Sequence, residues 1–113
     1  MTDTALLKQI LDSLTEPVLV GDTDHKVVYM NRAAVDHYTG GTALMGTSLL
    51  DCHNENSQRM MIEVLEALEA GEDERLISEN EKERIYMRAV RDESGGLVGY
   101  YERYERPMEK KQD

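Results

Sequence analysis

The segment from Arg84 to Tyr104 constrains the fold more than any other, because two strand-like runs flank a short polar break. Along each run, a more apolar and a more polar set of side chains alternate, as they do along a β-strand with one buried face. The break, residues 92–96, ends in two glycines, which readily adopt the positive φ angles of a bulged hairpin loop. The segment therefore predicts a long antiparallel hairpin.

The same alternation assigns each side chain of the hairpin to one face of the sheet. The first face would carry the more apolar set, with two polar groups at its end: Ile85, Met87, Ala89, Val98, Tyr100, Glu102 and Tyr104. The second face would carry the remaining side chains: Tyr86, Arg88, Val90, Leu97, Gly99, Tyr101, Arg103 and Glu105. We expect the first face to be covered by the rest of the chain.

A chain of 113 residues makes a single domain by length alone, and folding buries about two-thirds of the unfolded surface. Hydrophobic residues make up 40% of the chain, which is enough for a core. Phenylalanine and tryptophan are absent, so we expect leucine, valine, methionine and tyrosine to build that core.

The formal net charge of −10 argues against sequence-independent binding to nucleic acid or to anionic membranes, because both require clustered lysine and arginine. No apolar run approaches the ~20 residues of a membrane-spanning helix. The polar, acidic start does not resemble a signal peptide, so we expect a cytoplasmic protein. Cys52 is the single cysteine, which excludes an internal disulfide and leaves open whether its thiol is redox-active.

Residues 1–15 predict an N-terminal amphipathic helix, which Asp3 or Thr4 can cap and Pro17 ends. Leucine and isoleucine recur at helical spacing along one side of it: Leu6, Leu7, Ile10, Leu11 and Leu14. An apolar stripe of this size needs a partner surface. The partner would be the chain's own sheet, which gives a monomer, or a second copy of the chain.

Residues 16–106 predict one α+β domain that begins with a second hairpin. Its two short strands would cover residues 17–20 and 26–30, with turn-forming residues between them. Asn31 follows the second strand directly and can cap a short helix that ends near Tyr38.

The middle of the chain predicts helices, and its end predicts strands. Short helical pieces are expected over residues 42–52, and a longer helix begins at Asn54 or Asn56. The buried side of that helix would carry four apolar residues: Met61, Val64, Leu65 and Leu68. An edge strand over residues 72–78 then leads into the long hairpin. The expected fold is a five-stranded antiparallel sheet with helices over one face, followed by a charged tail, residues 107–113.

Three stretches, in this order and spacing, resemble the PAS family: Val28 to Ala34, Met45 to Leu50 and Val90 to Gly99. The resemblance covers roughly residues 5–105. It implies a PAS-like sheet whose helices enclose a pocket, and a sensory or interaction module in signal transduction. In some PAS domains this pocket holds haem, flavin or a small metabolite, so the resemblance alone leaves the ligand open.

Two shorter features bear on the subgroup and on metal binding. Cys52 and His53, followed by Ser57, resemble a PAS subgroup with a Cys-His-Pro-Pro-x-Ser run, although Asn54-Glu55 stands where the prolines would be. Thiolate and imidazole are good zinc ligands, but a structural zinc site needs four ligands. The only further nitrogen ligands would come from His25 and His37. We expect no metal site, with Cys52 in the core and His53 at the rim of the pocket.

Neither haem nor flavin is expected to bind. Haem-binding PAS sensors usually have their axial histidine on the long helix or just after it, and residues 60–78 contain none, although Met60 or Met61 could ligate haem. The light-sensing flavin subgroup has an Asn-Cys-Arg-Phe-Leu-Gln run, and Cys52 does not lie in such a run. We therefore expect no chromophore.

An enzyme that uses Glu102 and His53 as acid and base is the alternative function, since a carboxyl buried between tyrosines would have a shifted pKa. Glu102 could instead pair with Arg88 or Arg103, or reach solvent at the edge of the sheet. No phosphate-binding loop, nucleophile elbow or metalloprotease motif occurs in the chain.

Two sets of candidate site residues follow. A small ligand would bind in a pocket between the inner face and the middle helices, lined by Val28, Met30, Leu49, His53, Met61, Leu65, Met87, Val98, Tyr100, Glu102 and Tyr104. A homodimer, or a complex with a partner signalling protein, would use the first helix and the outer face of the sheet: Leu6, Leu7, Ile10, Leu11, Leu14, Tyr86, Val90, Leu97 and Tyr101.

Overall fold

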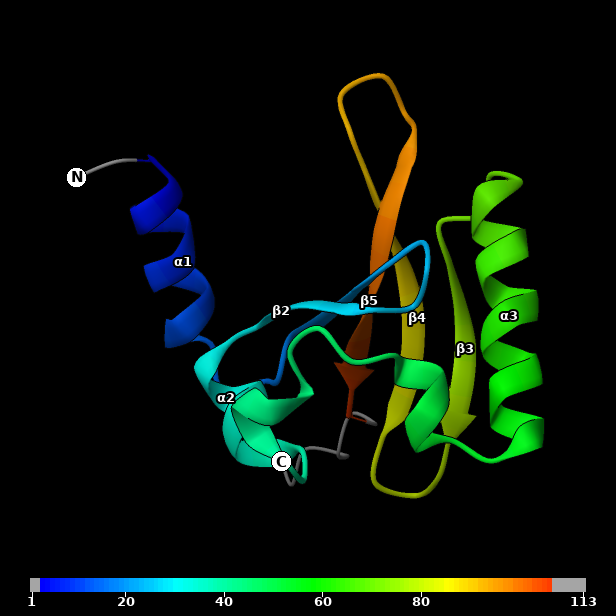
Figure 1. Cartoon of the computed structure of the whole chain (residues 1–113), viewed down its shortest axis with the longest axis horizontal. Helices are drawn as coiled ribbons and strands as arrows, with labels where there is room; N and C mark the ends of the chain where they lie inside the picture. Colours follow the sequence, from blue (N-terminus) through cyan, green and yellow to red (C-terminus); the bar gives the residue numbers. More distant parts are fainter. Residues whose placement is uncertain (1–2, 107–113) are drawn as a thin grey trace, which may run out of the picture.

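The computed structural model describes residues 3–106, and of Cys52 it describes the backbone alone. Its elements, in chain order, are α1 (Asp3–Ser13), β1 (Leu19–Asp22), β2 (Val27–Met30), α2 (Arg32–His37), the 3₁₀ turns η1 (Gly41–Leu44) and η2 (Leu49–Cys52), α3 (Glu55–Glu69), β3 (Glu74–Glu79), β4 (Arg84–Arg91) and β5 (Leu97–Glu105). The strands form one five-stranded antiparallel sheet in the order β2-β1-β5-β4-β3 (Figure 1). The predicted fold is confirmed. The predicted tail, residues 107–113, lies outside the described residues.

The long hairpin has the predicted register over most of its length. Met87 lies opposite Glu102 and Ala89 lies opposite Tyr100, so these side chains share one face. Met87 and Tyr100 are almost fully buried. The loop is held by the carboxylate of Asp92, which accepts hydrogen bonds from the backbone of Ser94 and Gly96.

Two residues predicted for the inner face, Val28 and Val98, are instead exposed, each at 49%. Both are the extra residue of a β-bulge. In β2, Tyr29 and Val27 lie opposite two consecutive residues of β1, so Val28 between them is skipped. In β5, Gly99 and Leu97 lie opposite two consecutive residues of β4, so Val98 is skipped in the same way. A bulge shifts the alternation of side chains by one residue, so these two predictions are wrong.

The same bulge also explains why Leu97 was assigned to the wrong face. Strict alternation along the strand predicted Leu97 on the outer face. The bulge instead turns Leu97 inward, where it packs against the main core. Its assignment to a dimer interface on the outer face is therefore wrong.

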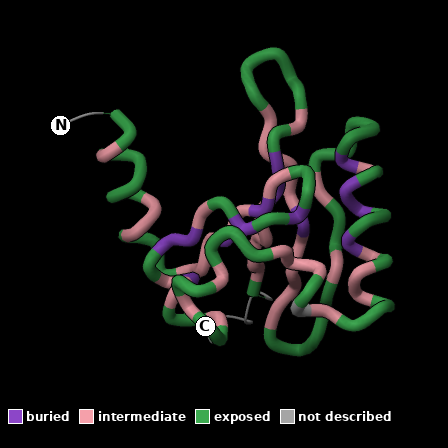
Figure 2. The backbone as a smooth tube through the Cα atoms, viewed as in Figure 1, coloured by how far each residue is buried: buried purple, intermediate pink, exposed green. Residues whose placement is uncertain are grey.

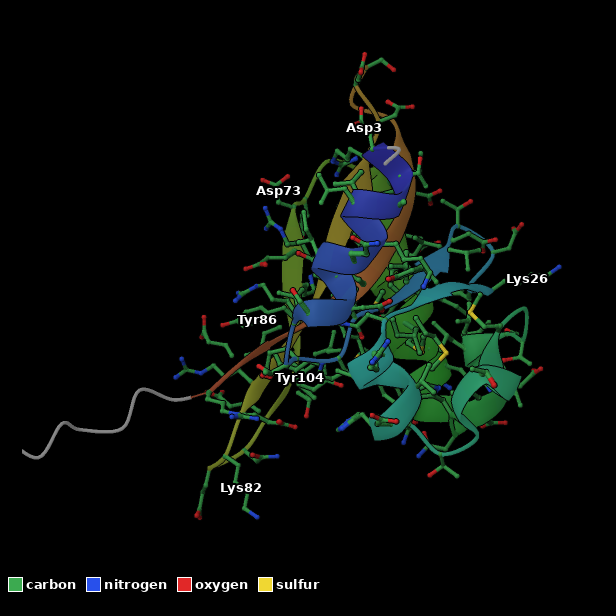
Figure 3. The ribbon with its side chains drawn as sticks, turned by 90° about the vertical axis from the view of Figure 1, so that its left-hand side faces the viewer. Asp3, Lys26, Asp73, Lys82, Tyr86 and Tyr104 are labelled. Carbon is green, nitrogen blue, oxygen red and sulfur yellow. The ribbon has the colours of Figure 1, made fainter. Side chains whose placement is uncertain are left out.

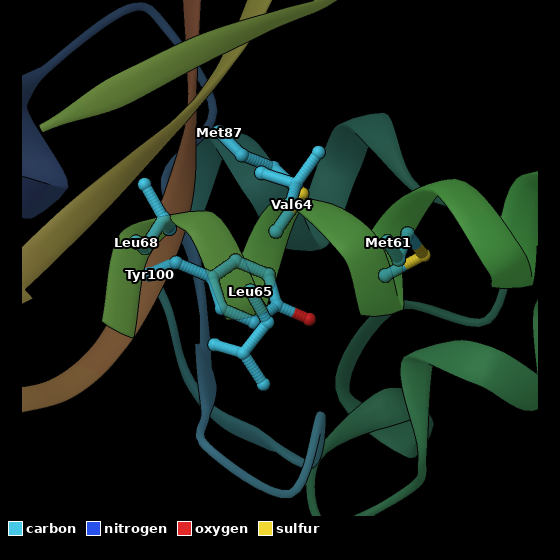
Figure 4. Packing of buried hydrophobic residues seen from close by; sticks show 6 residues of the cluster. All are labelled: Met61, Val64, Leu65, Leu68, Met87 and Tyr100. Atoms are coloured by element: carbon cyan, nitrogen blue, oxygen red, sulfur yellow. The ribbon is translucent and has the colours of Figure 1, made fainter. Parts of the chain in front are cut away.

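The main core lies between α3 and the sheet (Figure 4). It is built from six buried side chains: Met61, Val64, Leu65, Leu68, Met87 and Tyr100. Helix α3 begins where the Asn54 side chain accepts a hydrogen bond from the Ser57 backbone, and it ends before Gly71, whose φ is 120°. These contacts fix the helix that covers one half of the inner face.

A second, smaller core lies beside the first and is built from Leu19, Val27, Met30 and Ala34. Leu49 packs against both cores. The segment from α2 to η2 therefore covers the other half of the inner face, and the gap between the two cores is closed by this segment rather than by a long helix.

Helix α1 stands apart from the sheet and meets the rest of the fold only near its C-terminal end, beside α2 (Figure 1). None of its residues is buried (Figure 2). Its apolar stripe is open to solvent, with exposed fractions of 47% for Leu6, 60% for Leu7 and 49% for Ile10. Within the described part of the chain, no helix is long and apolar enough to cross a membrane.

Candidate ligand cavity

A cavity of about 290 Å³ lies where the two cores meet. Strands contribute Leu19 and Glu102, and the segment that covers them contributes the other lining residues: Tyr38, Thr39, Leu44, Leu49 and His53. Most of this lining is aliphatic or aromatic, with polar groups gathered at the Glu102 end. The size lies near the lower limit of ~300 to 1,000 Å³ for small-molecule sites.

The covering segment is positioned by two short helical ends. Tyr38 caps the C-terminus of α2 through a hydrogen bond from its backbone N–H to the carbonyl of Ala34. At this point the backbone turns back over the sheet. His53 closes η2 in the same way, through a backbone hydrogen bond to Leu50. Both cavity side chains therefore sit at fixed turns rather than on long mobile loops.

Glu102 is the polar centre of the cavity. The hydroxyl of Tyr38 lies 3.2 Å from its Oε1 atom, and the hydroxyl of Tyr104 lies 3.4 Å from the same atom. The two hydroxyls are 2.6 Å apart, so one donates to the other. Because burial disfavours the charged carboxylate, the pKa of Glu102 is raised, although these hydrogen bonds and the nearby His53 and His37 partly oppose the rise.

The tyrosines respond to the same surroundings. Burial, together with the charge of Glu102, raises the pKa of Tyr38 far above its ordinary value. Burial likewise raises the pKa of Tyr104 to about 12, against the opposing effect of the Tyr38 hydrogen bond. Both hydroxyls therefore stay protonated at neutral pH and act as hydrogen-bond donors.

His53 has one ring nitrogen already engaged. Its Nδ1 atom lies 2.5 Å from the carbonyl oxygen of Leu49. A carbonyl only accepts hydrogen bonds, so Nδ1 carries the proton, and the free Nε2 of the neutral ring is an acceptor.

The arginines predicted as alternative partners of Glu102 do not reach it. Arg88 and Arg103 both pair with Glu74 on the outer face, at 3.2 Å and 3.0 Å. That alternative is wrong. Arg103 follows Glu102 directly on β5, and Arg88 lies opposite Tyr101 rather than Glu102, so both arginines point to the other face of the sheet.

The predicted pocket residues divide into three groups. Leu49, His53 and Glu102 line the cavity. The others lie elsewhere on the inner side, where side chains already fill the space: Met30, Met61, Leu65, Met87 and Tyr100 in the two cores, and Tyr104 beside Glu102. Val28 and Val98 point to solvent, as described above.

Four lining residues were missed: Leu19, Tyr38, Thr39 and Leu44. The signal that could have identified Tyr38 is its position between a six-residue helix and the pair Gly40-Gly41. A large aromatic residue at such a turn can fold back over the sheet. Leu19, Thr39 and Leu44 carry no comparable local signal.

Asn31 connects the cavity's covering segment to α1, and it is fully buried, with an exposed fraction of 0%. Its Oδ1 atom accepts hydrogen bonds from the backbone of Val18 and Ala34, each at 2.9 Å. Its Nδ2 atom donates to the carbonyls of Leu11 at 2.8 Å and Glu16 at 3.1 Å. The local sequence pattern predicted only that Asn31 caps α2, and not that it also binds α1.

Two other histidines were considered as metal ligands. His25 is buried, and its Nδ1 atom lies 2.7 Å from the Tyr100 hydroxyl. His37 stacks edge-on against Tyr38 and Tyr104. Among the side chains that the structure describes, no three of His, Cys, Asp or Glu gather closely enough to hold a metal ion.

A second hollow, of about 340 Å³, lies at the junction of α1, α2 and the end of β5. It is lined mainly by polar residues, including Glu16, Asp36, Glu83 and Arg106. Arg106 approaches Glu16 at 3.8 Å across it. Because its lining is mainly polar and charged, it fits a small ligand less well than the cavity at Glu102.

The outer face of the sheet is a network of charged and aromatic side chains. The guanidinium of Arg103 lies 4.3 Å from the centre of the Tyr86 ring and pairs with Glu74 and Glu105. In Figure 3, Tyr86 lies on the side of the strands away from α2. Tyr101 shares this face, since it lies opposite Arg88.

Comparison with known proteins agrees with this architecture. The family model described as "PAS fold" matches residues 11–112. No curated protein matches the chain.

Several solved structures share the fold. A C-terminal domain from Streptococcus mutans has a TM-score of 0.75 at 21% identity, over 93% of this chain and 85% of that one. A sensory box sensor histidine kinase from Vibrio cholerae has a TM-score of 0.64 at 15% identity, over 93% and 92% of the two chains. The PAS domain of BvgS from Bordetella pertussis has a TM-score of 0.62 at 19% identity, over 95% and 88%.

Proposed function

This chain belongs to the PAS fold family, whose domains are sensory and signalling modules, and we propose that it senses a small ligand in the cavity at Glu102. The observation that carries the proposal is the composition of the cavity. An apolar lining with a few convergent polar groups at one end is the usual form of a small-molecule site.

The contacts around α2 suggest how an occupied cavity would influence the rest of the chain. At its C-terminal end, α2 is tied to Glu102 through the Tyr38 hydroxyl. At its N-terminal end, it is tied to α1 through Asn31. A ligand that displaces Tyr38 from Glu102 would shift α2, and Asn31 would carry that shift to Leu11 in α1. Both ends of a six-residue helix would then move together.

An acid-base enzyme that uses Glu102 and His53 is the alternative function of the same cavity. Both side chains line it, but each is already engaged, Glu102 by two tyrosines and His53 by a backbone carbonyl. PAS domains are in general sensory rather than enzymatic. We therefore favour ligand binding.

Native mass spectrometry of the purified chain, together with saturation-transfer NMR against a mixed fragment set, tests whether the cavity binds small molecules. We expect a retained small mass or fragment binding in the natural chain, and its loss in Leu44→Trp, which fills the cavity. The matched control is Leu76→Trp, the same change at an exposed position on β3. The proposal would be contradicted if the natural chain showed only its own mass and bound no fragment whose binding is lost in Leu44→Trp.

We further propose that the chain signals as a homodimer in which α1 packs against a second copy. The support is the exposed apolar stripe of α1, which its own sheet does not cover. Burying a leucine or isoleucine side chain contributes about 1.5–3 kcal/mol, so several of them in one stripe favour association. The anchoring of α1 at Asn31 would hold the stripe in a fixed direction.

Sedimentation velocity at micromolar concentration tests the dimer. We expect the natural chain to sediment as a dimer, and Leu7→Gln with Ile10→Gln to weaken the association by about a hundredfold, which is about 2.7 kcal/mol. Ile62→Gln is the matched control, because Ile62 has a similar exposure, 44%, on the outward side of α3. A natural chain that sediments as a monomer would contradict the proposal, as would equal effects of the α1 and α3 changes.

A further inference from the structure

We infer that the cavity selects a small cationic ligand, an apolar amine or amidine whose charged group pairs with Glu102. The inference rests on the proposed function, since it names the ligand class for the same cavity. It follows from three properties of the site: a carboxyl group with no cationic partner, an excess of hydrogen-bond acceptors, and limited apolar space.

The carboxyl group of Glu102 has no cationic partner among the described residues. The nearby arginines of β4 and β5 pair with other carboxylates, as Arg84 does with Glu79 and Arg103 does with Glu74. A buried carboxylate without a cation is costly, because hydrogen bonds replace only part of its hydration. A ligand that brings a positive charge would remove this cost.

The polar atoms left for a ligand are mainly acceptors. The tyrosine hydroxyls both approach the Oε1 atom of Glu102, and none of the hydrogen bonds found among the described residues uses Oε2. With Nδ1 of His53 donating to Leu49, the neutral tautomer of the ring would offer Nε2 as a further acceptor. An ammonium or amidinium group supplies several N–H donors together with a positive charge, so it can bind both the carboxylate oxygen and the ring nitrogen.

Anionic ligands do not fit the same site. A carboxylate or phosphate would lie against Glu102, and no arginine or lysine lines the cavity to offset the repulsion. An α-amino acid would be disfavoured for the same reason, since its carboxylate would lack a partner.

The rest of the cavity limits the size of the ligand and requires an apolar body. Leu19, Leu44 and Leu49 form its wall. A volume of about 290 Å³ has room for about ten groups the size of a water molecule, since each occupies about 30 Å³ in the liquid. A six-membered ring with one amino group is therefore a suitable probe.

Isothermal titration calorimetry of the full chain with three probes of one shape tests the inference: cyclohexylamine, cyclohexanol and cyclohexanecarboxylate. At about pH 7.5, we expect the amine to bind about tenfold more tightly than the alcohol, and the carboxylate not to bind, because charge is the main difference between them. Glu102→Gln should lower the affinity for the amine by about tenfold and change the affinity for the alcohol by less than about threefold. Glu105→Gln is the matched control, a carboxylate on the outer side of the same strand.

The dependence on pH gives a second, independent readout. Burial raises the pKa of Glu102, so the carboxyl stays protonated to higher pH than a free glutamate. The amine needs the carboxylate, so its affinity should rise as pH increases through that pKa, and the rise should be absent in Glu102→Gln. The titratable groups around Glu102 are His37 at the end of α2, Tyr38 and His53 directly after α2 and η2, and Tyr100 and Tyr104 on β5. Glu102→Gln separates the contribution of the carboxyl from that of the groups around it.

The outcomes separate this inference from the proposed function. If the alcohol binds as tightly as the amine, or the carboxylate binds best, the ligand is not selected by charge and the inference is overturned, while the cavity is still a ligand site. If none of the three probes binds, the inference is also overturned, and the fragment experiment above decides whether the cavity binds anything. The comparison of probes uses the natural chain, so it does not depend on whether Glu102→Gln folds.

Discussion

Replacing Asn31 with alanine should lower the free energy of unfolding by about 3–5 kcal/mol, which urea denaturation would measure. The fully buried side chain makes four hydrogen bonds to the backbone of Leu11, Glu16, Val18 and Ala34. Alanine would leave the N–H groups of Val18 and Ala34 and the carbonyl of Glu16 without these bonds, whereas the carbonyl of Leu11 still accepts from Leu14. Each buried unsatisfied group costs about 1–3 kcal/mol. The loss is a large fraction of the ~5–15 kcal/mol that stabilises a typical domain.

The control for Asn31 is Asn54→Ala, because Asn54 caps α3 through a single hydrogen bond and is exposed. Loss of an exposed cap costs about 1 kcal/mol. Asn31→Asp keeps the acceptor atom but loses the two donated bonds, so it should release α1 while α2 stays capped. Equal losses of stability for the alanine changes at Asn31 and Asn54 would show that the buried network contributes no more than an ordinary cap.

Replacing Gly99 with alanine should destabilise the chain by about 3 kcal/mol and separate β1 from β5. In the sheet, Gly99 lies opposite Asp22, and an added Cβ would overlap the carbonyl oxygen of Gly21. Backbone atoms in the centre of a sheet cannot move aside as the end of a flexible side chain can. Hydrogen exchange should show faster exchange along β1 and β5, together with the lower stability.

Gly96→Ala is the control for this change. Gly96 lies in the exposed loop of the same hairpin, and its added Cβ would meet only the carboxylate of Asp92, at 3.2 Å. We expect an effect within about 1 kcal/mol. A stable Gly99→Ala variant with normal protection in β1 would contradict the close approach of the two strands.

The regular parts of this fold could be predicted from the sequence, because local patterns determine them. The two glycines after Asp92 indicated the hairpin, and the alternation of Met87 with its neighbours indicated its inner face. Asn31 was recognised as a cap for the same reason, and Asn54 was one of two residues predicted to cap the longer helix, since a cap depends on about four neighbouring residues. The residues that failed were those whose position depends on the partner strand.

Val28, Leu97 and Val98 show why the partner strand matters. A bulge forms where two paired strands differ by one residue between fixed points, and neither strand alone reveals that difference. The error then propagated to the proposed pocket and interface, since one shifted residue changes face.

Only part of the cavity lining was predicted, and the shape of the cavity was not. Glu102 and His53 were identified by their chemistry, whereas Tyr38 reaches Glu102 across 64 positions of the sequence. Met61 and Met87 were expected to line the pocket, but both are buried in the main core. Where a cavity remains depends on how all side chains fill the interior, which no local pattern determines.

The link between the cavity and α1 is tested most directly by a ¹⁵N NMR titration of the natural chain with cyclohexylamine. We predict that the side-chain amide of Asn31 and the backbone amide of Leu11 shift in step with that of Thr39 in the cavity, and that in Glu102→Gln the same shifts need an amine concentration about tenfold higher. Shifts at Thr39 and Leu49 that saturate while Asn31 and Leu11 remain unchanged would contradict the link, because the ligand would then occupy the cavity without reaching α1.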